Sequence, residues 1–249
     1  MPAQLQQLLA ELSPAIEGAL EAHFPDCDQP QLAACMRHAV FSGGRRMRPT
    51  LCLLAAHALE TRQHATLPIA AAIEFLHTSS LIYDDLPAMD DSPQRRGAPA
   101  AHEKFGQGTA LLAGLTLVSH AFRLLAPAPQ LVEAASQCVA AMSAGQAIDL
   151  AGGQRDAAHY RKTTALFELA VTAPAIAFGA DATATRALAK FGEKLGSAYQ
   201  SMDDADDEGA DALRARARLA LQGALDALAP LHAPVLADYA RQLLQPVHA

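Results

Sequence analysis

Two aspartate clusters, each following an apolar run, are the residues of this sequence best suited to chemistry. Their members are Asp84, Asp85, Asp90 and Asp91 in the first, and Asp203, Asp204, Asp206 and Asp207 in the second. Pro87 disfavours helix just before it, which places Asp84 and Asp85 at a helix C-terminus, where negative charge is unfavourable. Asp203 and Asp207 share one helix face and repel each other there. A hard divalent cation relieves such repulsion, and Mg²⁺ is typically held by a few carboxylates plus substrate phosphates.

A single acidic cluster is more often a solvated turn, but the basic residues favour a ligand here. They gather in three short groups, which are Gly43-Gly44-Arg45-Arg46-Met47-Arg48-Pro49, Arg95-Arg96-Gly97 and Arg161-Lys162-Thr163. Arginine offers bidentate hydrogen bonds to phosphate and stays charged. In a chain of net charge −7, this grouping beside aspartates predicts a phosphorylated ligand held through metal.

Composition favours helix nearly everywhere. Half of the 249 residues are hydrophobic and tryptophan is absent, while alanine and leucine dominate over β-branched residues. The negative charge argues against nucleic acid. We see no export signal and expect a cytoplasmic protein without a transmembrane segment, since the uncharged stretch 105–122 is polar in part. The scattered cysteines lack metal-ligand spacing.

Periodicity and punctuation predict an all-α chain, a single domain over 1–249 in which about ten helices form a bundle around a central cavity. The expected helices lie near 3–22, 30–42, 48–61, 67–85, 107–126, 129–151, 157–179, 183–205, 210–229 and 232–246. Both acidic clusters then fall at the C-terminal ends of helices, the fourth and the eighth. If those ends face one cavity, the clusters grip one ligand from two sides.

The motifs together resemble those of the trans-isoprenyl diphosphate synthases, with the farnesyl and geranylgeranyl diphosphate synthases as nearest members. The first aspartate motif with Arg95-Arg96-Gly97 matches the bacterial form of the family's motif. Further matches, in order, are the 43–49 stretch, Gly145-Gln146 with Asp149, Lys162-Thr163, and Tyr199-Gln200 with Asp203-Asp204-x-x-Asp207. The similarity spans about residues 30 to 207 and also implies a polyprenyl synthetase-like domain and a homodimer.

The resemblance implies a condensation in which an allylic diphosphate ionises and the double bond of isopentenyl diphosphate attacks the resulting cation. The implied Mg²⁺ ligands are Asp84, Asp85, Asp90, Asp203, Asp204 and Asp207. Arg95 and Lys162 would contact the leaving diphosphate. The implied contacts to isopentenyl diphosphate are Arg45, Arg48, His77 and Arg96. Thr163 and Gln200 would present oxygen dipoles to the cation.

Product length is expected to depend on the helix that ends at Asp84. Ser80 and Ser79 lie one turn before that end, where farnesyl-forming relatives commonly place an aromatic ring. Because both side chains are small, we expect a geranylgeranyl product over farnesyl.

Several departures from the family pattern bear on activity. Arg45 replaces lysine, Tyr83 replaces a frequent histidine, and Thr164 replaces glycine. After Asp207 only 208–210 precede the next helix, where family members carry a longer, lysine-containing stretch. The alternatives are therefore a catalytically weak partner subunit, or a terpene cyclase or squalene-synthase-like enzyme, although the latter two have no need for the arginine stretch at 43–49.

Overall fold

The computed structural model describes residues 2–152, 157–208 and 211–245, with the backbone alone at 157–161 and 206–208. Within that part of the chain there are eleven α-helices, one short 3-10 helix and one two-stranded antiparallel ladder. The predicted all-α fold is confirmed.

The helices and strands follow one another as α1 Ala3–Ala22, α2 Pro30–Phe41, α3 Met47–Ala58, α4 Gln63–Asp84, β1 Gln94–Arg95, β2 Ala98–Pro99, α5 Ala101–Phe105, α6 Gln107–Leu125, α7 Pro129–Leu150, α8 Ala157–Phe178, α9 Ala182–Glu208, α10 Asp211–Ala227, η1 Ala229–Leu231 and α11 Pro234–Leu243.

Local sequence explains where several helices begin. Proline occupies the first position of α2, α7 and α11, where its fixed φ suits the helix and its missing N–H costs nothing. Asp181 caps α9, because its Oδ1 accepts hydrogen bonds from the backbone N–H groups of Thr183 and Ala184 at 2.7 and 2.8 Å. These caps fix the start of the long helix that carries the second aspartate cluster.

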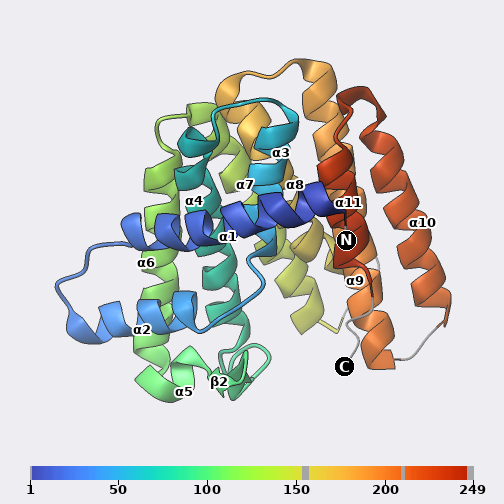
Figure 1. Ribbon diagram of the computed structural model, residues 1–249. Coiled ribbons are helices and arrows are strands. Elements are labelled where there is room, and N and C mark those ends of the chain that lie inside the picture. Colours follow the sequence, from blue (N-terminus) through green and yellow to red (C-terminus); the bar gives the residue numbers. More distant parts are fainter. Residues whose placement is uncertain (1, 153–156, 209–210, 246–249) are drawn as a thin grey trace.

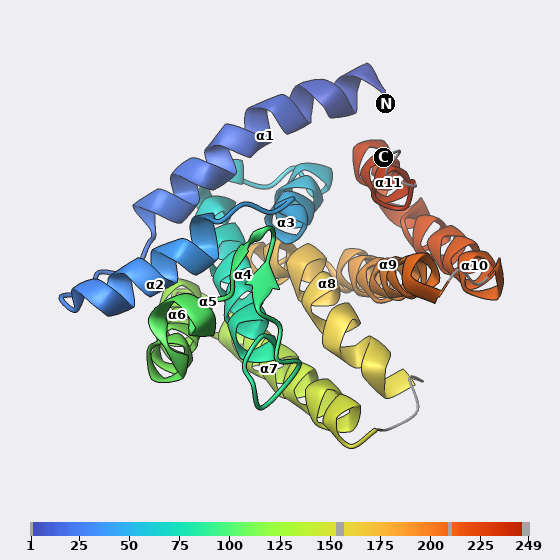
Figure 2. The same cartoon turned by 90° about the horizontal axis from the view of Figure 1, so that it is seen from below.

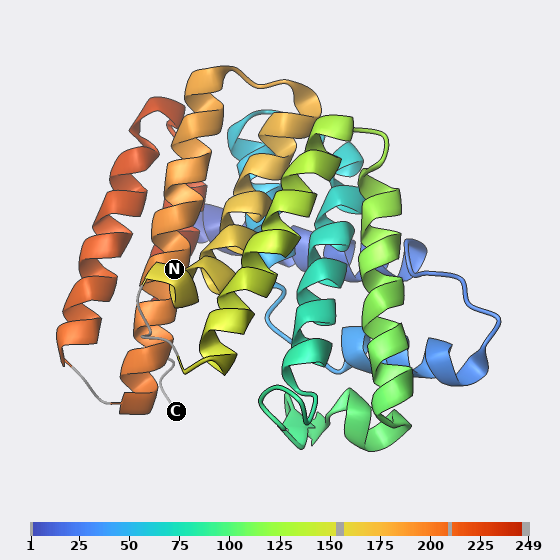
Figure 3. The same ribbon diagram turned by 180° about the vertical axis from the view of Figure 1, so that it is seen from behind.

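The long helices stand side by side, in the order α10, α9, α8, α7, α4 and α6 (Figure 3). Helix α1 crosses them at a steep angle (Figure 1) and packs on α3 and α4. Seen from below, α4 is central, with α2, α3, α6, α7 and α8 around it (Figure 2). The side chains of Phe75, Ile73 and Leu76 on α4 are fully buried in the core, so the helix that ends in the first aspartate cluster is held on most sides.

The clearest differences from the sequence-based expectation are a short helix, a short hairpin and the start of α4. The five-residue helix α5 and the strands of two residues each were not predicted, because elements so short carry no readable periodicity. Helix α4 begins at Gln63 rather than 67. Pro68 therefore lies inside the second turn, where it removes one hydrogen bond without ending the helix.

Among the helices that the structure describes, α4 and α6 are long and apolar enough to cross a membrane by length and composition alone. Of the most apolar 18-residue stretch of each helix, 67% is buried inside the protein in α4 and 39% in α6. Core helices of globular proteins have the same length and composition, so this property does not show a membrane span.

Candidate active site

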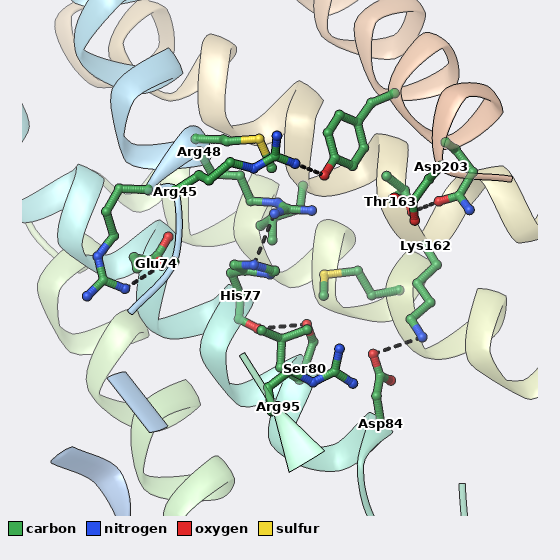
Figure 4. Close-up of a pocket in the computed structure, with 18 of the residues that line it drawn as sticks. Arg45, Arg48, Glu74, His77, Ser80, Asp84, Arg95, Lys162, Thr163 and Asp203 are labelled. Atoms are coloured by element: carbon green, nitrogen blue, oxygen red, sulfur yellow. Dashed lines mark hydrogen bonds and ion pairs between the residues drawn. The ribbon is translucent and has the colours of Figure 1, made fainter. Parts of the chain in front are cut away.

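One cavity of about 480 Å³ lies where the loop before α3 meets α4, the β1–β2 hairpin, α7, α8 and α9. Figure 4 shows its walls. The structure brings together there most of the site residues predicted from the sequence, namely Arg45, Arg48, His77, Ser80, Asp84, Arg95, Arg96, Lys162, Thr163, Gln200 and Asp203.

Two glycines bring α9 close to α8. A Cβ on Gly192 would stand 2.6 Å from the Cα of Glu168, and a Cβ on Gly196 would stand 2.8 Å from the Cα of Thr164. No larger residue fits at either position without separating the helices. This approach places the cavity-lining residues of α8 opposite those of α9.

Asp84 on α4 and Lys162 on α8 meet in one wall of the cavity. The Nζ of Lys162 lies 2.9 Å from Asp84 Oδ2 (Figure 4), and Lys162 also donates a hydrogen bond to Gln146. Burial raises the pKa of the Asp84 carboxyl, and the neighbouring lysine opposes that rise. The end of α4 and the start of α8 therefore meet at one charged pair.

The other aspartates of the first cluster are not among the residues that line this cavity in the described structure. Asp85 is buried and forms an ion pair with Arg95. Asp90 is exposed, and its backbone N–H donates to the carbonyl of Asp84 at 2.9 Å. Of the predicted aspartates in this cluster, Asp84 alone lines the large cavity in the described structure.

In the second cluster, Asp203 lines the cavity, and Asp204 is not among its lining residues in the described structure. Thr163 Oγ1 donates to Gln200 Oε1 at 2.6 Å, and Gln200 Nε2 donates to Asp204 Oδ1 at 2.9 Å. This chain of hydrogen bonds fixes the Thr163 and Gln200 side chains. The side chain of Asp207 and the shortened stretch 208–210 lie outside the described residues, apart from the helical backbone to Glu208.

The wall that faces Asp84 and Lys162 carries the positive charges of Arg45 and Arg48. Arg45 donates to the Tyr199 hydroxyl at 2.5 Å, and Arg48 Nη1 lies 3.0 Å from His77 Nε2. The Arg48 guanidinium also stands over the Phe167 ring, 5.0 Å from its centroid. Burial, with the nearby guanidinium groups, lowers the pKa of His77 well below its usual range. His77 is therefore a neutral hydrogen-bond acceptor for Arg48.

A second cavity of about 280 Å³ opens from the first between α4 and α7. Ser80, Asp84, Met142 and Lys162 line both cavities. The added lining residues are Tyr83, Met89, Val139, Ser143, Gln146, Ala147 and Leu150. Ser79 is not among the described residues that line either cavity, since its side chain is buried in the core and donates to the carbonyl of Leu76.

With this geometry in place, the comparisons identify the family. The sequence profile of the polyprenyl synthetase family matches residues 29–214. The chain belongs to the polyprenyl synthetase family. It is 37% identical to the farnesyl diphosphate synthase of Geobacillus stearothermophilus, over 83% of this chain and 77% of that protein.

It is also 34% identical to the geranylgeranyl diphosphate synthase of Cyanophora paradoxa, over 80% of this chain and 73% of that protein. Several other relatives are longer, and the chain spans 57 to 58% of their length. The crystal structure of a geranyltransferase from Legionella pneumophila superposes with a TM-score of 0.87 at 28% identity, over 97% of this chain and 96% of that one. Family membership confirms the predicted enzyme class, a transferase of isoprenoid biosynthesis.

Two charged residues of the polyprenyl synthetase site were not assigned a role from the sequence. Arg46 lies inside the 43–49 stretch, and its Nη1 pairs with Glu74 Oε1 on α4 at 3.0 Å. Glu74 could have been noticed in the sequence, because it is the one charged residue within the apolar run 69–76. A charge buried in such a run requires a partner.

Proposed function

We propose that this polyprenyl synthetase condenses isopentenyl diphosphate with an allylic diphosphate and releases a geranylgeranyl diphosphate, or alternatively a farnesyl diphosphate. The observation that carries the proposal is one cavity with two differently charged walls. Arg45 and Arg48 give one wall its positive charge, with the neutral His77 beside them, whereas Asp84 and Asp203 stand with Lys162 on the other. Two diphosphates, one bound directly and one through metal, suit these walls.

Mg²⁺ is the metal that suits the donor set. Among the described residues, no three His, Cys, Asp or Glu side chains gather closely enough to hold a metal ion. Mg²⁺ usually keeps several waters and binds one or two carboxylates plus substrate phosphates. Asp84 and Asp203 would supply those carboxylates, with Asp85, Asp90, Asp204 and Asp207 as further predicted ligands. When bound, the metal would supply Lewis-acid stabilisation of the departing diphosphate.

The residues of the chain perform the remaining steps. Lys162 and Arg95 would bind the allylic diphosphate, so that negative charge developing on it as the C–O bond breaks is met by fixed cations. Arg45, Arg48, His77 and Arg96 would hold isopentenyl diphosphate with its double bond toward the allylic carbon. Thr163 and Gln200, held by their hydrogen bonds, would direct oxygen dipoles at the cation. A new C–C bond forms, and a proton is lost from the former isopentenyl unit.

The growing chain would enter the second cavity, which is lined by methionine, valine and leucine side chains. Ser80 stands at the junction of the two cavities, and we propose that the size of the side chain at this position determines product length. Its small side chain leaves the passage open, which supports the geranylgeranyl product.

A homodimer is the proposed assembly. Helix α6 exposes Leu111, Leu112 and Leu115, whose exposed fractions are 48%, 55% and 60%. An apolar strip of this kind is typical of a subunit interface. Sedimentation analysis of the parent and of Leu115→Glu tests this proposal, and equal molar masses in the two would contradict an interface at α6.

One incubation tests the proposed reaction. The purified chain is mixed with Mg²⁺, isopentenyl diphosphate and dimethylallyl, geranyl or farnesyl diphosphate, and the dephosphorylated products are separated by chromatography. Product formation that EDTA abolishes is the expected result. No product from any primer would favour the weak partner subunit, and a cyclic hydrocarbon formed without isopentenyl diphosphate would favour a cyclase.

A further inference from the structure

The Glu74 carboxylate is a buried charge that the roles above leave unused. Its side chain is 1% exposed, and it lies on the cationic side of the cavity, away from Asp84 and Lys162 (Figure 4). Its Oε1 accepts a hydrogen bond from Arg46 Nη1 at 3.0 Å. Within the described part of the chain, Glu74 Oε2 and Arg48 Nε are buried atoms without a hydrogen-bond partner. A buried carboxylate is costly to maintain, so its position beside a phosphate site requires a reason.

The neighbours of Glu74 supply that reason. Burial raises the pKa of the Glu74 carboxyl, while the guanidinium groups of Arg46, Arg48 and Arg96 lower it. Burial conversely lowers the pKa of Arg48 and of Arg96, and Glu74 opposes this for both. Three like charges that converge on one wall repel one another before any ligand arrives. Glu74 is the acidic group buried among them.

Arg46 transmits the effect of Glu74 to the loop before α3. Its backbone is in the left-handed region, at φ 47°, which is strained for a residue with a side chain. Its guanidinium is anchored at three further points, to Glu17 Oε1 at 2.7 Å, to the carbonyl of Val40 at 2.8 Å and to that of Gly43 at 3.4 Å. Arg46 thus ties the loop that carries Arg45 to α1, α2 and α4.

We propose that Glu74 is a positioning residue for the second, non-allylic diphosphate. It fixes Arg46, and through it the loop that presents Arg45 and Arg48, and it offsets the repulsion among the converging guanidinium groups. The inference rests on the proposed function, since it concerns the binding of isopentenyl diphosphate at this wall.

The direction in which Glu74→Gln changes the binding of isopentenyl diphosphate shows whether Glu74 positions the arginines or acts on the diphosphate through its charge alone. A negative charge next to a diphosphate repels it, so a carboxylate that acted only through its charge would weaken binding, and its removal would strengthen binding. A carboxylate that positions the arginines has the opposite effect. Glu74→Gln keeps the shape and removes the charge, and it places an N–H donor among guanidinium donors that need an acceptor.

The expected result for Glu74→Gln is a rise of about tenfold or more in the KM for isopentenyl diphosphate, with the KM for the allylic primer and kcat within about threefold of the parent. The matched control is Glu17→Gln, which removes the other acid from the same Arg46. The Glu17 side chain is 47% exposed, so its loss should change neither KM appreciably. If the glutamine variant does not fold, Glu74→Asp takes its place, since it keeps the charge on a shorter side chain. It should raise the KM for isopentenyl diphosphate to a smaller degree, again with little change in the KM for the primer or in kcat.

Calorimetric binding of isopentenyl diphosphate to each protein, without primer, completes the test. A parent that binds and a Glu74→Gln variant that binds equally well or more tightly would overturn this inference alone. Equal rises in both KM values, or a Glu17→Gln variant as impaired as Glu74→Gln, would also overturn it, because general damage to the fold would then explain the result. A parent that binds no isopentenyl diphosphate and forms no product would overturn the proposed function itself.

Discussion

The guanidinium of Arg96 lies over Gly44, so closely that a Cβ on Gly44 would stand 2.6 Å from the Cζ of Arg96. The same guanidinium donates a hydrogen bond to the carbonyl of Gly43. Arg96 itself stands at the tip of the β1–β2 hairpin, in the left-handed region at φ 54°. The two glycine- and arginine-containing motifs, far apart in the sequence, are therefore one structural unit in the cavity wall.

Gly44→Ala should weaken the binding of isopentenyl diphosphate, because the new methyl group displaces Arg96. Gly43→Ala is the matched control. Gly43 and Gly44 have positive φ, at 99° and 123° respectively, so both substitutions carry backbone strain of about 1–3 kcal/mol. A Cβ on Gly43, however, meets nothing within 4 Å. We expect similar falls in Tm for the two variants, and a KM for isopentenyl diphosphate that rises about tenfold further in Gly44→Ala. Equal KM values would refute a role for the Arg96 contact.

Asp84→Ala and Asp203→Ala should each lower turnover by several orders of magnitude, because each removes the cavity-facing carboxylate of its cluster. Asp91→Asn serves as the control, since Asp91 is exposed and asparagine tolerates its left-handed backbone at φ 49°. Steady-state rates at saturating Mg²⁺, with far-ultraviolet circular dichroism to check folding, provide the measurement. A folded variant that retained a near-parental rate would exclude that aspartate from the proposed metal site.

His77 should remain neutral from pH 8 to pH 6 in the free protein. Its burial and the surrounding arginines hold its pKa well below the usual value near 6.5. Arginine only donates, so His77 Nε2 accepts from Arg48 and the ring proton resides on Nδ1. Nitrogen-15 NMR of the imidazole reports both the tautomer and the charge. An imidazolium signal for His77 at pH 6.5 would contradict this assignment.

The same shift in the pKa of His77 has a consequence for stability. As the pH falls below about 6.5, the unfolded chain takes up a proton at this side chain and the folded chain does not. The free energy of unfolding should therefore decrease by up to about 1.4 kcal/mol per pH unit from this residue. His77→Gln removes that contribution, so urea titrations at pH 7.5 and 6.0 should show a smaller loss of stability in the variant. Equal losses in variant and parent would show that His77 is not responsible.

The fold could be predicted from sequence because nearly all of its elements are long helices with readable periodicity and proline or glycine at their ends. The two cluster-bearing helices, α4 and α9, were placed within a few residues of their observed bounds. Motif spacing likewise indicated which residues converge, since Asp84 and Asp203 line the same cavity. The β1–β2 hairpin, which presents Arg95 and Arg96, was too short to predict.

Side-chain direction is what the sequence did not contain. Asp84 and Asp85 are adjacent in sequence, yet the first lines the cavity, whereas the second pairs with Arg95 and does not line it. Consecutive residues at a helix end point about 100° apart, and no pattern of residue types reveals which of two aspartates faces inward. For the same reason, Ser80 lines the cavities whereas Ser79 is buried in the core. The partner of Glu74 is Arg46, whose position depends on a loop conformation that only the tertiary structure determines.

Ser80, and not Ser79, should set product length. Ser80 lines both cavities at their junction, so a phenylalanine there would project into the passage that the growing chain must follow. Ser79 is 3% exposed within the core, where a larger side chain overpacks its neighbours rather than blocking the cavity. We expect the parent to form mainly a twenty-carbon product, Ser80→Phe to stop at least one five-carbon unit earlier, and Ser80→Ala to match the parent. Ser79→Phe should lower Tm and leave product length unchanged. Chromatography of dephosphorylated products decides the matter: an unchanged product from Ser80→Phe, or a shortened one from Ser79→Phe, would show that the chain follows another path.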